Sequence, residues 1–535
     1  MYLFQRILIS FFIVLTCVSA ISQNRNHIGA LNEFRMYDVH HYDLKIEVDI
    51  AAKTINGSNT ISFSVDKPTK FIQIDLYEQF AIHKVAYNGS VLKFDRAPNH
   101  FIVSFPEACT AGKIYELTIE YSGTPTEAKN PPWKGGFTWS TDSLGNPWIA
   151  TSCQGIGASS WWPNKDHLSD RPDSLDIRIS IPQTYNKLYA VSNGELKSVD
   201  EHDNHLVFHW HTSYPINNYN VTLNIGNYAH FERRNYNAVT HKSLKMDFYV
   251  LKPNKNKAKN YFIHAYDMLN CYEHYFGPYP FWNDGYGLVE TPFWGMEHQG
   301  AIAYGNNYKL NEFGFDFILI HESAHEYWGN SVGCKDNGEL WIHEAFATYS
   351  ESLFVEWRDG QEKANEYLKK QRQKIKNSEP LIGPLDVNYS GYKTTDMYYK
   401  GAWMLHTVRN IVDNDSLWFG FVKNIALQYK MKQISSIELL DLVKRDLGFE
   451  SYTFLKHTVY KTELPILEYD IKKGKKINFR FSNVDSDFRI PISLVCEKGS
   501  QKIIATSEWK QIKLTDNNIL KLEIENYLIN SISSK

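Results

Sequence analysis

The chain is poor in cysteine. Only 6 of its 535 residues are cysteine, and one of these lies within the first 20 positions. The other five, Cys109, Cys153, Cys271, Cys334 and Cys496, are far apart in the sequence. No disulfide framework and no C-x-x-C zinc site is visible, although one or two bridges stay open. A small disulfide-stabilised scaffold is therefore excluded.

An excess of charge of one sign is also missing. The formal net charge is −3, which gives no reason to expect nucleic acid or an anionic membrane as a partner. No glycine-rich loop precedes a helical pattern, so no nucleotide site is predicted. With 43% hydrophobic and 22% charged residues the composition is that of a globular protein. The chain is longer than a domain with a single hydrophobic core usually is, so about two to four domains are expected.

Long apolar runs are confined to the N-terminus. Residues 7–18 are almost continuously apolar, follow Arg6 and precede Val18-Ser19-Ala20, a small-residue cleavage site. This pattern predicts a signal peptide over residues 1–20 and an exported protein, periplasmic or secreted, without a membrane span after cleavage. An uncleaved anchor helix is the alternative, but a bilayer span needs ~20 apolar residues.

Apolar and polar residues alternate after this segment. Apolar side chains occupy every second position from 42 to 50, which is the periodicity of a β-strand. The dipeptides Asn56-Gly57 and Asn88-Gly89 predict hairpin turns. We therefore expect an N-terminal β domain over residues 21–239.

Helical patterns replace the strands further along. Residues 257–276 fit a helix that Gly277-Pro278 ends. Short β runs return beyond a linker at 461–465 and fit a small sandwich. The predicted fold class is a multidomain α+β protein, with a mostly α domain over 240–464 and a C-terminal β-sandwich over 465–535.

One short motif in the helical region carries the chemistry. It is His321-Glu322-Ser323-Ala324-His325, followed after 18 positions by Glu344. Residues four apart share one helix face, so His321 and His325 can bind one metal ion. Catalytic zinc takes three protein ligands plus water, and Glu344 supplies the third. Glu322 lies about 80° around the helix, where it can accept a proton from the water instead of binding the metal.

Five residues alone can match this motif by chance. The sequence context favours the zinc site. The motif follows an apolar run at 315–320, and Glu344 lies early in a second helical pattern over 338–357. A lone carboxylate among bulky apolar side chains is costly unless it is paired or bound to metal.

A second group of histidines is a candidate for another metal site. His202, His205, His209 and His211 lie in one segment, and His209 and His211 would share one strand face. Solvated strand histidines are the commoner explanation, and it applies equally to His40-His41.

The zinc motif is joined by three further segments. They are Gly295-Met296-Glu297-His298-Gln299-Gly300, Tyr398-Tyr399-Lys400-Gly401 and Ser152-Cys153-Gln154. They resemble, respectively, the G-x-M-E-N, Y-x-K-G and Q-C-Q or Q-C-E motifs of the gluzincin aminopeptidases of the aminopeptidase N and leukotriene hydrolase family, and they occur along the chain in the order found in that family. The resemblance covers roughly residues 39–467. It implies a β-rich saddle domain, a thermolysin-like catalytic domain and a C-terminal β domain, in a short form without a large C-terminal helical domain.

The resemblance also implies roles for single residues. His321, His325 and Glu344 match the zinc ligands, Glu322 the general base and Tyr398 the tyrosine that stabilises the tetrahedral intermediate. Tyr399 is the alternative to Tyr398, but its spacing to Lys400-Gly401 fits less well.

A second group of positions implies how substrate is held. Glu297 matches the carboxylate that binds the free α-amino group of the substrate, and Gln154 the residue that assists it. Gly295 and Met296 match the segment that binds the substrate backbone. Gln154 could equally satisfy only backbone groups. Trp294 borders this segment, and its orientation is left open.

Four departures from the family pattern stand near these motifs. His298 replaces a usual Asn, Ala345 a usual Gly, Ser152 the first Gln and Tyr327 a common Trp. None alters a metal ligand or the base. His298 and Ser152 lie near the amine site, so they put the substrate preference in doubt. The short form suggests an open cleft with weak discrimination by peptide length.

The sequence thus predicts an exported zinc metallo-aminopeptidase with one zinc ion per chain, acting on peptides with a free N-terminus. A non-catalytic scaffold of the same fold, an epoxide hydrolase side activity and a thermolysin-type endopeptidase are the alternatives. A scaffold would be expected to lose Glu322 or a ligand, and Glu297 argues against an endopeptidase.

Overall fold

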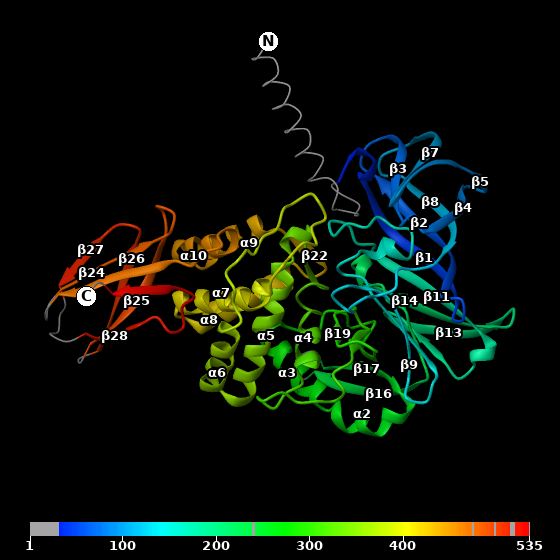
Figure 1. Cartoon of the computed structure of the whole chain (residues 1–535). Helices are drawn as coiled ribbons and strands as arrows, with labels where there is room; N and C mark the ends of the chain where they lie inside the picture. The colour runs from blue at the N-terminus through cyan, green and yellow to red at the C-terminus, as the bar shows by residue number, and fades with distance from the viewer. Residues whose placement is uncertain (1–30, 238–240, 473–475, 497–498, 514–518, 534–535) are drawn as a thin grey trace, which may run out of the picture.

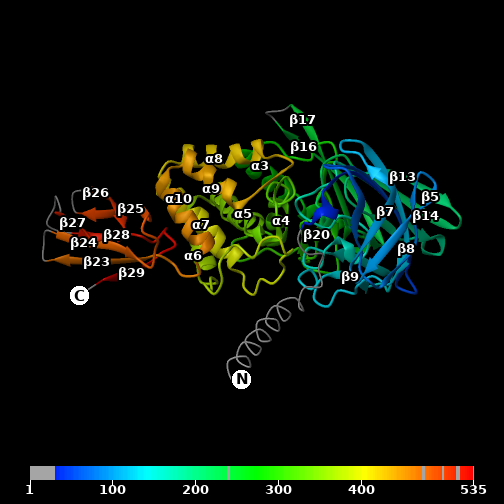
Figure 2. The same cartoon turned by 90° about the horizontal axis from the view of Figure 1, so that it is seen from above.

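The computed structural model describes residues 31–237, 241–472, 476–496, 499–513 and 519–533. Three parts follow one another in a row. A β-rich N-terminal part lies at one end, helices fill the middle and a C-terminal group of strands forms the other end (Figure 1). The view from above shows the same row (Figure 2). The predicted signal peptide at 1–20 lies outside the described residues.

An eight-stranded sheet dominates the N-terminal part. Its central strand β1 (Tyr37–Asp49) pairs antiparallel with β2 (Thr54–Val65) and parallel with β11 (Ser174–Pro182). The predicted alternation is visible in β1, where Tyr42, Leu44 and every second residue after them are buried. The sheet order is β13 (Glu195–His202), β14 (His205–Thr212), β11, β1, β2, β8 (Ile114–Gly123), β4 (Phe80–Tyr87) and β5 (Ser90–Val91).

One of the two predicted turns is placed wrongly. Asn88-Gly89 does join β4 to β5, and both residues have positive φ. Asn56-Gly57, however, lies inside β2, and the chain turns before it at 50–53. There the Asp49 side chain accepts a hydrogen bond from the Ala52 amide (2.8 Å), and Lys53 takes a left-handed conformation with φ of 57°. Side-chain capping of the turn outweighs the usual Asn-Gly preference.

Two smaller sheets complete the N-terminal part. The four-stranded sheet contains β10, which leads directly into Gln154. Its order is β12 (Tyr189–Val191), β15 (Asn224–Gly226), β10 (Pro147–Ser152) and β9 (Gly136–Thr141). The three-stranded sheet has the order β3 (Thr69–Asp75), β7 (His100–Cys109) and β6 (Lys93–Ala97).

The middle part opens with a five-stranded sheet whose edge strand is β19 (Gly295–Met296). The order is β16 (Tyr228–Asn237), β17 (Lys242–Leu251), β18 (Tyr286–Glu290), β20 (Ile302–Tyr304) and β19. This sheet begins before residue 240, because β16 pairs with β17 along its whole length. A further pair joins β21 (Val332–Cys334) to β22 (Lys432–Ile434).

Helices cover this sheet and build the core of the middle part. The helix predicted at 257–276 is divided into two, α2 and α3, and ends at Gly277, whose φ is +96°. The helices are α2 (Lys255–Tyr261), α3 (His264–Phe276), α4 (Phe317–Ala324), α5 (Trp341–Asp359), α6 (Gln361–Arg372), α7 (Asp396–Val412), α8 (Asp415–Gln428), α9 (Ser436–Asp446) and α10 (Phe449–Tyr460).

The C-terminal part consists of strands in two sheets that follow α10. One sheet has the order β27 (Lys510–Lys513), β24 (Lys476–Ser482), β23 (Ile466–Lys472) and β29 (Asn530–Ser533). The other has the order β26 (Gly499–Thr506), β25 (Arg489–Cys496) and β28 (Ile519–Glu523).

The predicted fold class, a β-rich N-terminal domain, a helical middle domain and C-terminal β-structure, is confirmed. The domain boundaries at 239 and 464 stay predictions. Cys109, Cys153, Cys271 and Cys334 are buried and unpaired. Among the described residues no helix is both long and apolar enough to cross a membrane.

Candidate metal centre

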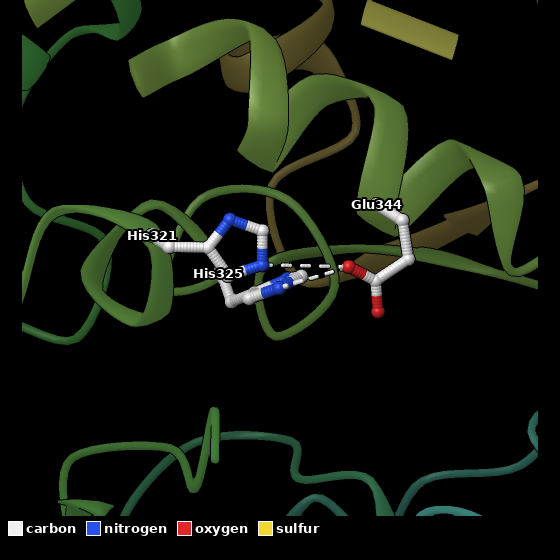
Figure 3. A group of neighbouring side chains, drawn as sticks. All are labelled: His321, His325 and Glu344. Atoms are coloured by element: carbon white, nitrogen blue, oxygen red, sulfur yellow. Dashed lines mark ion pairs between the residues drawn. The ribbon is translucent and has the colours of Figure 1, made fainter. Parts of the chain in front are cut away.

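Three side chains from two helices converge on one point. Asp316 caps the N-terminus of α4 by accepting a hydrogen bond from the Leu319 amide, and every residue of the H-E-x-x-H motif is buried. His325 follows the last residue of α4 but keeps helical dihedral angles, so it stays on the face of His321. The Nε2 atoms of His321 and His325 lie 3.6 and 3.5 Å from Glu344 Oε2, which comes from α5 (Figure 3).

The opposite nitrogen of each ring is fixed by an acceptor. His321 Nδ1 donates to Glu351 Oε1 (2.7 Å), and His325 Nδ1 donates to the Trp328 carbonyl (2.9 Å). With the proton held at Nδ1, each Nε2 presents a lone pair to the same point. Glu351 is itself held by Tyr367 and by Gln371 Nε2 (3.0 Å).

This donor set fits zinc. Tetrahedral zinc with bonds of ~2.0–2.1 Å separates its ligand atoms by about 3.4 Å, close to the observed spacing. Glu344 Oε2 is buried and has no hydrogen-bond partner among the residues that the structure describes. A buried carboxylate oxygen without a donor is costly, and a bound cation at this point would satisfy it.

The charges around the three side chains favour a cation. Burial alone would lower the pKa of His325, but the Glu344 and Glu297 carboxylates raise it to about 9. Burial would raise the pKa of Glu344, but the two histidines hold it well below its usual range. The negative potential that stabilises positive charge on the histidines also favours a divalent metal ion.

Glu322 lies beside this centre. Its carboxylate oxygens come within 4.8 Å of ligand atoms of His325 and Glu297. Burial raises its pKa to about 7, although the neighbouring histidines oppose this. Gly295 leaves the space for it, because a Cβ atom at Gly295 would lie 2.6 Å from Glu322 Oε1.

Glu297 follows the edge strand β19 and faces the same centre. It is 3% exposed, and its Oε1 accepts hydrogen bonds from Gln154 Nε2 (2.7 Å) and Tyr219 OH (3.0 Å). Burial raises the pKa of Glu297 above its ordinary value. Two donors on one buried carboxylate fix it in place, and a cationic group is the remaining partner that the charge calls for.

The structure distinguishes Tyr398 from Tyr399. The ring of Tyr398 lies 6.1 Å from the ring of His321, and burial followed by the Glu344 charge raises its pKa well above the ordinary value. Tyr399 accepts a hydrogen bond from Lys374 Nζ (3.2 Å) instead. Tyr398 is therefore a protonated donor beside the metal centre.

A close helix crossing holds Tyr398 against the ligands. A Cβ atom at Gly401 on α7 would lie 2.6 Å from the Cβ of Ala345 on α5. Only glycine at 401 allows the helices to approach this closely. Ala345 follows the ligand Glu344, so this contact sets the position of Tyr398 relative to the metal centre.

The other departures from the family pattern lie apart from the ligands. His298 is fully buried and lacks a hydrogen-bond partner for either ring nitrogen within the described part of the chain. Burial lowers its pKa to about 3, so it is neutral. Ser152 is buried at the end of β10, and Tyr327 OH donates to the Gly277 carbonyl (3.1 Å).

A cleft with a volume of about 210 Å³ gives access to the metal centre. It is lined by His321, His325, Glu344, Glu322, Glu297, Gln154 and Tyr398. Three aromatic side chains, Trp133, Trp294 and Phe317, also line it.

The strand histidines do not form a comparable group. His41, His209 and His211 surround Asp176 on the large sheet, with His209 Nε2 2.6 Å from Asp176 Oδ1. Among the described residues, two sets of three side chains have potential ligand atoms that all lie within 4.8 Å of one another. The sets are His321, His325 and Glu344, and Glu297, Glu322 and His325, so both include His325 of the centre described above.

Two residues of the site were missed by the sequence prediction. Glu351 lies seven residues after Glu344, two turns along the same helix face, so helical periodicity could have revealed it. Tyr219 carries no such signal, because it reaches Glu297 only through the docking of the N-terminal part onto the middle part.

Comparison with known families agrees with the fold. Residues 39–219 match the peptidase M1 N-terminal domain, and residues 262–457 match the peptidase family M1 domain. The second match contains His321, His325 and Glu344.

Relatives and solved structures fall in the same family. The chain is 23% identical over 428 residues to endoplasmic reticulum aminopeptidase 1 of Mus musculus, covering 75% of this chain and 45% of the relative. It is 22% identical over 483 residues to probable aminopeptidase 1 of Sulfurisphaera tokodaii, covering 83% and 57%. The chain thus spans about half the length of these relatives.

The fold is shared with an M1 zinc metallopeptidase of Deinococcus radiodurans, solved as a mutant bound to a Tyr-Ser-Ala substrate. The TM-score is 0.68 at 22% identity, covering 81% of this chain and 96% of that one. The two domain matches, in the same order as the two folded parts that build the site, show that this chain belongs to peptidase family M1.

Proposed function

We propose that this protein is a zinc aminopeptidase that removes N-terminal residues from peptides. The observation that carries the proposal is the position of Glu297. Its buried carboxylate, fixed by Gln154 and Tyr219, lies within 4.8 Å of His325 and Glu322 ligand atoms. A free α-amino group bound there places the first peptide bond at the metal centre.

One zinc ion per chain, held by His321, His325 and Glu344, would polarise the scissile carbonyl and make water more acidic. Glu322 then accepts a proton from the attacking water and passes it to the leaving amine. Its buried position beside Gly295 keeps it near the reacting atoms.

Tyr398 supplies a hydrogen bond to the oxyanion. A phenol with a raised pKa stays protonated at neutral pH, so it donates when negative charge develops on the carbonyl oxygen. No proton has to leave it during the reaction.

Glu297 sets the selectivity for chain ends. An ammonium group pairs with its carboxylate, whereas an internal peptide bond offers no charge at that distance. This disfavours a thermolysin-type endopeptidase. A scaffold role and an epoxide hydrolase side activity are supported by no separate feature of the site.

Export is the second part of the proposal. It is supported by the apolar run at 7–18 and the small-residue site at Val18-Ser19-Ala20. N-terminal sequencing of protein recovered from the periplasm or the medium would find a start near Ile21, and recovery of the uncleaved chain would contradict it.

Incubation with a peptide library, half of it N-acetylated, tests the activity. Stepwise loss of N-terminal residues from the free-amine half alone, read by mass spectrometry and absent from Glu322→Gln, is the expected result. Cleavage inside both halves would replace the proposal with an endopeptidase. Intact peptides in the presence of zinc-loaded protein would leave a scaffold.

A further inference from the structure

The direction of a bound peptide follows from the edge strand β19. β19 pairs only with β20 among the described strands, so its other edge is open for an extended peptide backbone. Glu297 follows β19 at its C-terminal end, and Trp294 precedes it. Glu322 lies against Gly295, between these two positions.

The order of Trp294, Gly295 and Glu297 along the chain fixes the direction in which a bound peptide runs. If the amino group is bound at Glu297, the reacting bond lies at the level of Gly295 and Glu322. The residues after that bond then run towards Trp294, antiparallel to β19. Beyond Glu297 the opposite direction is closed by His298 and Gln299, which are 0% and 2% exposed.

Three aromatic rings line the side of the cleft that the peptide reaches in this direction. Phe317 stacks on His321 with ring centres 5.4 Å apart and planes at 16°, and Trp294 stacks on Phe317 at 5.4 Å and 25°. Trp133, from the N-terminal part, lies 6.2 Å from Trp294. We call Trp133, Trp294 and Phe317 the aromatic wall.

The aromatic wall has apolar surface exposed to the cleft. Trp294 is 44% exposed and Trp133 is 61% exposed. The Trp294 indole N–H donates to Asn306 Oδ1 (3.3 Å), which holds the ring in its position against Phe317. The wall itself carries no charged side chain. Its chemistry suits flat, apolar groups.

We propose that the aromatic wall binds the side chains of the residues after the scissile bond and favours aromatic side chains there. This inference rests on the proposed function, because it places the amino group at Glu297. The wall therefore selects the sequence of the leaving peptide, while the first residue is recognised elsewhere in the cleft.

Four tripeptides separate these positions: Ala-Ala-Ala, Phe-Ala-Ala, Ala-Phe-Ala and Ala-Ala-Phe. Initial rates of removal of the first residue would be measured for the wild-type protein and for Trp294→Ala and Trp133→Ala. One aromatic contact beyond area burial changes binding by roughly up to tenfold. We expect Trp294→Ala to lower kcat/KM for Ala-Phe-Ala or Ala-Ala-Phe, relative to Ala-Ala-Ala, by about tenfold, mainly through KM.

Matched variants show whether the rings themselves act. Trp294→Phe keeps a ring and should keep most of the preference. Trp509→Ala removes a tryptophan that is 51% exposed in the C-terminal part and should change nothing. A loss confined to Phe-Ala-Ala, or an equal loss for all four peptides, would overturn the proposal.

A binding measurement keeps the test independent of turnover. Calorimetry in the Glu322→Gln background compares the affinities of Ala-Phe-Ala and Ala-Ala-Phe with that of Ala-Ala-Ala, with and without Trp294→Ala. Tighter binding of an aromatic leaving half that disappears with Trp294 supports the wall. Equal affinities overturn it even if the peptides are hydrolysed, and the library experiment decides the aminopeptidase activity separately.

Discussion

Two of the histidine and carboxylate clusters in the described part of the chain differ in what holds them. At the centre on α4 and α5, each histidine donates from Nδ1 to a fixed acceptor, and each Nε2 faces Glu344. On the large sheet, His209 and His211 point their ring nitrogens at Asp176 itself. In the first arrangement the unprotonated Nε2 atoms converge on one point where a metal can bind, whereas in the second the ring N–H groups themselves donate to the carboxylate.

Burial sharpens the difference. The side chains of His321, His325 and Glu344 are 7%, 1% and 4% exposed, whereas Asp176 and its histidines are 21–29% exposed. Water can solvate the surface cluster, but it cannot reach Glu344 Oε2 freely. The same residue types thus form a metal site only where a buried acceptor orients each ring.

The largest expected effect comes from removing a ligand. Glu344→Gln should weaken zinc binding by more than about 10³-fold, because one of three ligands loses its charge. His209→Gln in the surface cluster should leave the zinc content unchanged. Metal analysis after dialysis gives both values, and loss of one zinc equivalent in His209→Gln would erase the contrast between the clusters.

The next largest effect is expected from removing the Tyr398 hydroxyl, a hydrogen-bond donor beside the metal centre that the surface cluster lacks. Tyr398→Phe should reduce kcat by ~10²–10³-fold with the zinc content intact, since it removes one hydrogen bond to the oxyanion. Tyr399→Phe, which affects a ring held by Lys374, should reduce kcat little. Steady-state kinetics decides, and equal losses in the two variants would count against the role of Tyr398.

A smaller effect is expected from the acceptor that orients His321. Glu351→Gln should lower zinc affinity by ~10–100-fold, because the ring loses its charged partner. Glu366→Gln, in an exposed pair with Lys363, is the control. Competition with a chelator measures the affinities, and an unchanged affinity in Glu351→Gln would show that ring orientation does not depend on this carboxylate.

The smallest effect is expected in the surface cluster. Burial raises the pKa of Asp176, but His209 and His211 outweigh it and hold the pKa below its usual range. The resulting stabilisation is present above the ordinary pKa of ~3.9 and is lost as the pH falls through the lowered value.

Asp176→Asn should therefore lower the free energy of unfolding by about 1 kcal/mol at pH 7, with no difference from the wild type in strong acid. Denaturant unfolding at both pH values measures this. A difference that persists in acid would assign it to packing instead of charge.

The parts that local periodicity controls could be predicted from the sequence. The i, i+4 spacing of His321 and His325 and the helix that carries Glu344 follow from residues close together in the chain. The partners of Glu297 could not be derived from spacing, since Gln154 and Tyr219 lie 143 and 78 residues away. Only the resemblance pointed to Gln154, and nothing pointed to Tyr219.

The position of the first hairpin turn could not be predicted from the local sequence either. Asn56-Gly57 has the composition of a hairpin turn but lies within β2, because the preceding residues make a turn that Asp49 caps. Pairing of β2 with both β1 and β8 fixes its register across the sheet, which a local dipeptide cannot report.

The contact of Gln154 and Tyr219 with Glu297 joins the N-terminal part to the middle part. The metal ligands all come from the middle part, whereas the groups that steady the amine-binding carboxylate come from the N-terminal part. Under the proposed function, selectivity for the N-terminal peptide bond therefore depends on the junction between these two parts. A substitution that loosens this junction, far from the metal centre, would leave a hydrolase that cleaves peptide bonds but no longer distinguishes a free N-terminus from an internal position.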